Sequence, residues 1–145
     1  MPSIWILSAN GARATIYSAE APTAALVEVA SLEHPEARSK EMELTSDRPG
    51  RTFDSFGSGR HAKSSEVGPK QTEQIRFARE VVDRLEQGRV GHAFERLVVV
   101  AAPAFLGHLR DSMSAPLASA VSLEIDKDYT ALRPDELRSH LPERL

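Results

Sequence analysis

The sequence predicts one α/β domain over residues 1–145, built on a mixed five-stranded sheet with helices on its faces. Asn10-Gly11 stands between two strand-like runs and predicts an antiparallel hairpin, because both residues tolerate a positive φ. Leu97–Ala101 is an unbroken apolar run, which is typical of a strand buried on both faces. Apolar residues at spacings of three and four from Ile75 to Leu85 predict a long amphipathic helix. Together these observations indicate the order β-β-β-α-β-α-β-α.

The first three strands are predicted from alternation and from strand-forming residues. They cover Ile4–Leu7, Arg13–Ser18 and Ala25–Leu32, and they form a meander. His34–Glu36 predicts the start of a short helix, because a proline there is followed by an acidic residue.

The long helix covers roughly Lys70–Gln87, and Gln87-Gly88 predicts its C-terminal cap. After the buried strand we expect a helix that ends at Ser114–Pro116, then an alternating half-buried strand and a terminal helix. These three elements are predicted at Pro103–Met113, Val121–Ile125 and Pro134–Leu141.

The composition excludes several classes of site. The chain has no cysteine, so disulfides and cysteine-ligated metals are excluded. Its five histidines are scattered, with no two at metal-ligand spacing, and we expect neither a metal nor a cofactor. No apolar run is long enough for a signal peptide or a membrane span, so we expect a cytoplasmic location. The oligomeric state is left open.

Residues 46–69 are predicted to form a long loop that is basic although the protein as a whole is acidic. Residues 47–70 carry five basic and three acidic residues, whereas the remainder carries 13 basic and 18 acidic ones. Glycines let backbone N–H groups approach a phosphate, and arginines supply paired donors, so this loop is suited to a nucleic acid. The candidate partner-binding residues are Arg48, Arg51, Gly57, Gly59, Arg60, His61 and Lys63. The alternative is a solvated loop whose small charge excess is chance.

Three other groups of polar residues have plainer interpretations. His61 is a candidate general base, but no serine–histidine–aspartate spacing supports catalysis by it. Arg13 follows the hairpin turn and either lines a groove or projects into water, and we favour water. The charges of Glu124–Asp128 are interpreted as a solvated strand edge that blocks edge pairing. No catalytic residue is assigned.

Seven short motifs follow one another along nearly the whole chain. They are Asn10–Ala14, Pro35–Arg38, Ser46–Arg51, Gly59–Ala62, Arg76–Arg79, Ala102–Gly107 and Glu124–Asp128. In this order they resemble a bacterial family named for attachment to host cells, which is grouped with the bacterial relatives of archaeo-eukaryotic release factors. The element order also resembles the ribonuclease-H-like fold and, more narrowly, the central domain of archaeal and eukaryotic class I release factors.

The resemblance implies a loop with a defined role in those release factors. There, the loop between the third strand and the first long helix carries a Gly-Gly-Gln motif that is used in peptidyl-tRNA hydrolysis. Here Phe56–Ala62 occupies this place without a glutamine, since Gln71 and Gln74 lie at the start of the helix. A two-metal nuclease of the ribonuclease H type is also disfavoured, because the first and central strands carry no acidic residue.

The resulting hypothesis is a non-catalytic module that associates with RNA or the ribosome, with its basic loop approaching the tRNA or rRNA backbone. Two alternatives stay open. One is an attachment factor, as the family name implies, although the missing signal sequence argues against direct action at the cell surface. The other is a hydrolase that uses Arg60 and His61.

Overall fold

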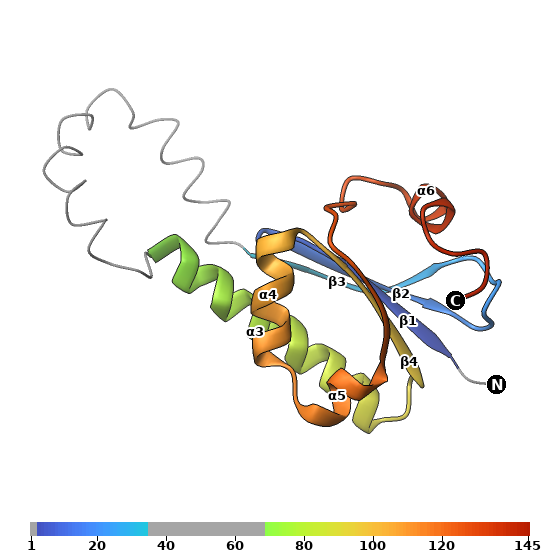
Figure 1. Ribbon diagram of the computed structural model, residues 1–145, viewed down its shortest axis with the longest axis horizontal. Helices are drawn as coiled ribbons and strands as arrows, with labels where there is room; N and C mark the ends of the chain where they lie inside the picture. The colour runs from blue at the N-terminus through green and yellow to red at the C-terminus, as the bar shows by residue number, and fades with distance from the viewer. Residues whose placement is uncertain (1–2, 35–68) are drawn as a thin grey trace, which may run out of the picture.

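The computed structural model describes residues 3–34 and 69–145. Three strands are followed by a long helix, a strand, two shorter helices, a strand and a terminal helix (Figure 1). The strands are β1 (Ile4–Ala9), β2 (Arg13–Ala19), β3 (Val27–Glu33), β4 (Arg96–Ala101) and β5 (Val121–Ile125). The helices are α3 (Pro69–Val90), α4 (Pro103–Ser112), α5 (Ala115–Ala120) and α6 (Pro134–Ser139). All five predicted strands are confirmed, and the order differs from the predicted one by α5.

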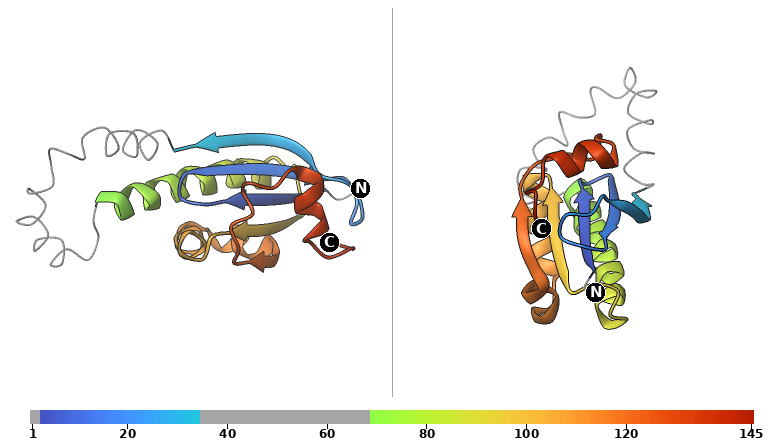
Figure 2. Two further views of the ribbon diagram at one scale, coloured as in Figure 1. Left: turned by 90° about the horizontal axis from the view of Figure 1, so that it is seen from above. Right: turned by 90° about the vertical axis from the view of Figure 1, so that its right-hand side faces the viewer.

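The strands form one mixed sheet in the order β3-β2-β1-β4-β5. β1 lies antiparallel to β2 and parallel to β4, and β5 extends the parallel part beyond β4. Helices α3, α4 and α5 pack on one face, and α6 packs on the other (Figure 2). Every residue of Leu97–Ala101 is buried, as predicted for a strand covered on both faces.

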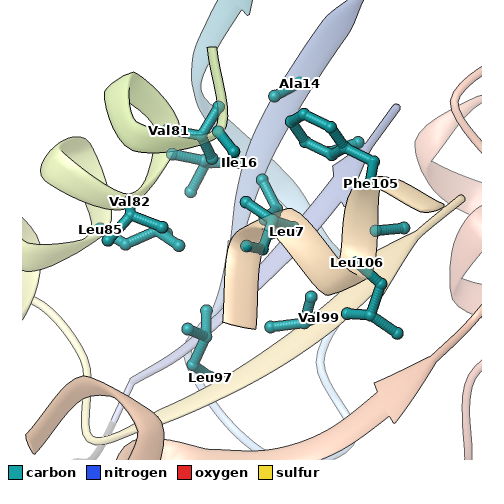
Figure 3. Close-up of a cluster of buried hydrophobic side chains, with 14 of the residues drawn as sticks. Leu7, Ala14, Ile16, Val81, Val82, Leu85, Leu97, Val99, Phe105 and Leu106 are labelled. Atoms are coloured by element: carbon teal, nitrogen blue, oxygen red, sulfur yellow. The ribbon is translucent and has the colours of Figure 1, made fainter. Parts of the chain in front are cut away.

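The larger of two buried clusters lies between the sheet and α3, α4 and α5 (Figure 3). Leu7, Ile16 and Val99 from the strands meet Val81 and Phe105 from the helices there. The smaller cluster, on the opposite face, packs side chains of β1, β2 and β4 against α6. Because full burial of a large apolar side chain is worth about 1.5–3 kcal/mol, the two clusters stabilise the sheet from both sides.

The predicted hairpin of β1 and β2 is confirmed, but its turn is not of the predicted kind. Neither Asn10 nor Gly11 has a positive φ. Instead, Asn10 Oδ1 accepts hydrogen bonds from the backbone N–H groups of Ala12 at 2.8 Å and Arg13 at 3.0 Å. The asparagine therefore closes the turn with its side chain, which an Asn-Gly pair does not reveal by itself.

The predicted end of the long helix at Gln87-Gly88 is wrong, because α3 continues to Val90. Gly88 is a glycine for a different reason. A Cβ at this position would lie 2.5 Å from Cη2 of the buried Trp5 ring and 3.2 Å from Cε1 of Phe94. The glycine lets a tryptophan pack against the helix backbone.

The actual end of α3 is a Schellman motif centred on His92. Its backbone N–H donates to the carbonyl of Arg89 at 3.0 Å, and the N–H of Ala93 donates to the carbonyl of Gly88 at 2.8 Å. His92 takes the left-handed conformation, with φ 58°, that this motif requires. Glycine is the usual residue at this position of the motif. For that reason the sequence pattern predicted the end of the helix at Gly88 rather than at His92.

The segment Ser114–Pro116, predicted only to end a helix, also starts α5. Ser114 is the N-cap, and its side chain accepts a hydrogen bond from the N–H of Leu117 at 3.2 Å. Pro116 lies in the first turn, where a proline is tolerated because the N–H it lacks has no partner in the helix. The predicted short helix at His34–Glu36 lies outside the described residues from residue 35 onward.

Candidate functional site

The carboxyl ends of β1, β4 and β5 lie at one edge of the sheet, because these three strands are parallel. After β1 the chain continues to β2 and β3 on one side, whereas after β4 it continues to β5 on the other. The boundary between β1 and β4 is therefore a topological switch point, and open α/β sheets bind ligands outside the carboxyl ends at such points. This carboxyl edge is the candidate functional site.

Asn10, directly after β1, connects the carboxyl edge to the segment that follows β5. Its Nδ2 donates to Asp128 Oδ2 at 3.0 Å and to Thr130 Oγ1 at 3.1 Å. Thr130 donates to Asp128 Oδ1 from its backbone N–H at 3.0 Å and from its hydroxyl at 2.7 Å. Both carboxylate oxygens are thus hydrogen-bonded, and two residues 118 positions apart are held together.

These contacts stabilise Asp128 in its ionised form. Burial by itself raises the pKa of this carboxyl group. The hydrogen bonds from Thr130 and Asn10, with the positive charge of Arg13 nearby, outweigh burial and hold the pKa below its ordinary value. Arg13 itself is exposed at the start of β2, which confirms that it projects into water.

The lowered pKa of Asp128 predicts a stability difference that depends on pH. Asp128→Asn should lower the free energy of unfolding by about 1 kcal/mol at pH 7, because the ionised acceptor is lost. A carboxyl with a lowered folded pKa stabilises the fold above its unfolded value of about 4, and the effect disappears as the pH falls through the folded value. Urea unfolding at pH 7 and at about pH 2 measures the difference between variant and wild type.

Asp126→Asn is the matched control, because Asp126 is an exposed aspartate on the same segment and its substitution removes the same charge. It should change the free energy of unfolding by no more than about 0.5 kcal/mol at either pH. An Asp128→Asn deficit of equal size at both pH values would contradict the prediction.

Ser8 adds a buried hydroxyl to the carboxyl edge. It lies on β1, two residues before Asn10, which directly follows the strand. The residue is 2% exposed, and within the described residues its Oγ is buried without a hydrogen-bond partner in the protein. Its neighbours in register are Thr15 and Val100. Because an unpaired buried hydroxyl costs stability, this donor and acceptor group is suited to a polar partner.

The last residue described before the gap and the first helix after it both lie at the carboxyl edge. His34, buried directly after β3, stacks on Phe77 of α3 with ring centroids 5.3 Å apart. Its Nδ1 lies 3.2 Å from the carbonyl oxygen of Gly11. A Cβ at Gly11 would lie 2.8 Å from Nε2 of Gln74, so the β1–β2 turn also packs closely on α3. Helix α3 extends past this edge at its N-terminal end (Figure 1).

All seven partner-binding residues predicted from the sequence lie outside the described residues. They are Arg48, Arg51, Gly57, Gly59, Arg60, His61 and Lys63. Their role stays a prediction. The structure describes the carboxyl edge, and the chain segment with the seven candidate residues begins and ends beside that edge.

The interpretation of Glu124–Asp128 as a solvated strand edge is incomplete. These residues do form the end of the edge strand β5 and the segment directly after it, but two of the carboxylates have specific partners. Glu124 Oε1 accepts a hydrogen bond from Nε of Arg110 at 3.0 Å, and Asp128 binds Asn10 and Thr130. The hydrogen bond that Asp128 accepts from the backbone N–H of Thr130, two residues later, is a turn pattern that the local sequence can indicate. The contact of Asp128 with Asn10 has no such local signal.

The polar groups of the carboxyl edge are the side chains of Ser8, Asn10, Arg13, Asp128 and Thr130.

Within residues 3–34 and 69–145, no group of three or more histidine, aspartate or glutamate side chains is placed to hold a metal ion. No helix in the described part of the chain has both the length and the apolar character needed to cross a membrane.

Comparison with known proteins matches the chain to the family model described as "Protein required for attachment to host cells". It covers residues 5–141, from β1 to the end of α6 and beyond. No curated protein matches the chain. The match confirms the resemblance to the attachment family, while the relation to release factors stays a prediction. Since the match spans nearly the whole sequence, the chain belongs to the family of proteins required for attachment to host cells.

Proposed function

We propose that this protein is a non-catalytic, cytoplasmic module that associates with RNA or the ribosome through residues 46–69, resembling the central domain of archaeo-eukaryotic release factors. The basic residues of that segment would contact phosphates of the tRNA or rRNA backbone. The acidic remainder of the chain, with 14 basic and 18 acidic residues outside 46–69, would limit non-specific binding.

One observation carries this proposal. The segment with the predicted phosphate-binding residues is inserted between β3 and α3, and both flanking elements meet at the carboxyl edge beside the switch point. Binding residues are commonly found on loops that a rigid scaffold positions in this way. The stacking of His34 on Phe77 fixes one end of the insertion against α3.

The strand order adds support. A five-stranded sheet with an antiparallel meander on one side and two parallel strands on the other agrees with the ribonuclease-H-like expectation. The carboxyl edge offers hydrogen-bonding groups at Ser8, Asn10 and Thr130. Its carboxylate, Asp128, accepts hydrogen bonds from Asn10 and Thr130 through both of its oxygens. A binding role therefore suits these groups.

The test is co-sedimentation with ribosomes at two salt concentrations. The proposal expects salt-sensitive binding by the wild type, because displacement of counterions from phosphates dominates such contacts. The triple variant Arg48→Ala/Arg51→Ala/Arg60→Ala should bind at least tenfold more weakly at low salt. Its slope of log affinity against log salt should flatten by about 0.7–0.9 for each phosphate contact removed.

Arg84→Ala/Arg110→Ala/Arg144→Ala is the matched control, because it removes three exposed arginines that lie elsewhere on the chain. This control should bind within about twofold of the wild type, allowing for its change in net charge. No binding by the wild type to ribosomes or tRNA at low salt would refute the proposal, and equal losses in both triple variants would exclude residues 46–69 as the contact.

A second candidate, a factor that acts in attachment, is favoured by the family description. Cell fractionation separates the two functions. Protein found at the cell surface, together with a loss of adhesion when its gene is deleted, would support attachment. Protein found with ribosomes would support the first proposal.

A further inference from the structure

A cavity of about 580 Å³ lies between α3 and α4, on the face of the helices that is turned away from the sheet. Six of its lining residues form two facing rows. They are Ile75, Arg79, Val82 and Asp83 from α3, and His108 and Asp111 from α4. We call this cavity the interhelical groove. Its volume is in the range of small-ligand sites.

The α3 wall of the interhelical groove combines an apolar floor with opposite charges. Its four residues lie at i, i+4, i+7 and i+8, so they share one side of the helix. Val82 is 3% exposed and Ile75 is half-buried, whereas Arg79 and Asp83 are exposed. The cation and the anion are therefore four residues apart, about 6 Å along the helix axis, above an apolar surface.

The α4 wall repeats this arrangement with a different chemistry. His108 and Asp111 lie three residues apart and face the same groove. The His108 ring contacts Phe105 edge-on, with centroids 6.5 Å apart, which fixes its position on α4. Next to it, a Cβ at Gly107 would meet nothing within 4 Å, so the backbone of α4 is open to approach there.

Three charged groups of the interhelical groove have no partner among the described residues. Within the described part of the chain, no hydrogen bond or ion pair involves Arg79, Asp83 or Asp111. By contrast, one turn further along, Glu86 accepts hydrogen bonds from Ser114 and from Arg89. The groove thus brings groups of both signs together beside two apolar side chains, and convergent polar groups in a concave site are what orients a ligand.

We propose that the interhelical groove binds a short zwitterionic peptide. Arg79, with a hydrogen bond from His108, takes the terminal carboxylate, and the pair Asp83 and Asp111 takes the terminal ammonium. The apolar side chain of the peptide packs on Val82. The peptide ammonium beside Asp111 would lie near the C-terminal end of α4, which ends at Ser112. The C-terminal end of a helix favours a cation, so this orientation of the peptide is consistent with the helix dipole. The two aspartates disfavour a phosphate ligand, so this site is independent of the proposed RNA contact.

The probe is the dipeptide Ala-Leu, titrated into the full chain and followed by amide and imidazole NMR shifts. We expect saturable shifts at Gly107 and His108 with a dissociation constant of about 1 mM, which is ordinary for so small a ligand. N-acetyl-Ala-Leu lacks the ammonium and Ala-Leu-amide lacks the carboxylate, and each should bind at least tenfold more weakly. Absence of saturable shifts at about 10 mM Ala-Leu, or equal binding of the capped forms, would overturn the proposal.

Two pairs of matched variants locate the contact. Arg79→Ala and Asp83→Asn should each weaken Ala-Leu binding at least tenfold. Arg84→Ala and Glu80→Gln remove the same charges from exposed positions of α3 outside the groove, and they should stay within twofold of the wild type. Losses in the control variants as large as those in the groove variants would also overturn it.

Discussion

Arg138→Ala is expected to lower the free energy of unfolding by about 3 kcal/mol. The Arg138 side chain donates to four carbonyl oxygens. They are those of Ala24 at 3.1 Å, Pro22 at 3.1 Å, Pro142 at 2.7 Å and Glu143 at 2.8 Å. The bonds to Ala24 and Pro22 are partly buried, and a hydrogen bond to a charged donor is worth about 1.5–3 kcal/mol. The two exposed bonds add little, because water replaces them.

The loss should spread beyond these bonds, because Arg138 holds α6 and the C-terminal segment against the β2–β3 turn. Leu137 and Leu141, on either side of it, belong to the smaller buried cluster. Urea unfolding measures the effect. Arg133→Ala is the control, since that side chain is 71% exposed and its ion pairs should contribute no more than about 1 kcal/mol. Equal losses in the two variants would refute the role of Arg138.

Gly88→Ala is expected to destabilise the protein by about 2 kcal/mol, although alanine favours a helix. The added methyl group would lie 2.5 Å and 2.6 Å from two atoms of the Trp5 ring. Trp5 is 6% exposed, and its ring centroid lies 4.9 Å from that of Phe94. Forcing a methyl into a filled core costs about 1–3 kcal/mol, and a rigid ring places this case at the upper end. The gain of alanine over glycine in a helix, about 1 kcal/mol, offsets only part of it.

Gly107→Ala is the matched comparison, because it makes the same change inside α4 where a Cβ meets nothing within 4 Å. This variant should gain up to about 1 kcal/mol from helix propensity. Thermal and urea unfolding of both variants should therefore give shifts of opposite sign. Two stabilised proteins would show that the Trp5 ring moves aside at little cost.

The sequence predicts most of this sheet because its signals are local. Alternation and unbroken apolar runs identify the five strands, and the buried run at Leu97–Ala101 is confirmed in full. The sequence fails where a residue serves a distant partner. Gly88 has the sequence appearance of a helix cap, yet it is a glycine because Trp5 packs on it. Trp5 and Gly88 are 83 positions apart in the sequence, so no local pattern predicts their contact.

The candidate site divides in the same way. Asn10 is identified as a turn residue from its neighbours, and it does close the turn. Its second role, holding Asp128 and Thr130, depends on β1 and β5 having their carboxyl ends at one edge. Only the assembled strand order places them together. The prediction for residues 46–69 rests on charge and on resemblance, and it awaits the binding experiment.

The pairing of β1 with β4 has a consequence for how the chain reaches its native state. β1, β2 and β3 are neighbours in sequence and can form their ladders early, whereas Ile4 finds its parallel partner only at Arg96. The entropy of closing so long a connection has to be overcome before that ladder forms. Until then, β1, all of whose residues are buried in the folded protein, presents one side with unpaired N–H and C=O groups, which is a template for another chain. Aggregation during refolding is therefore expected to begin at β1, and α3 and β4 protect the protein once they have docked.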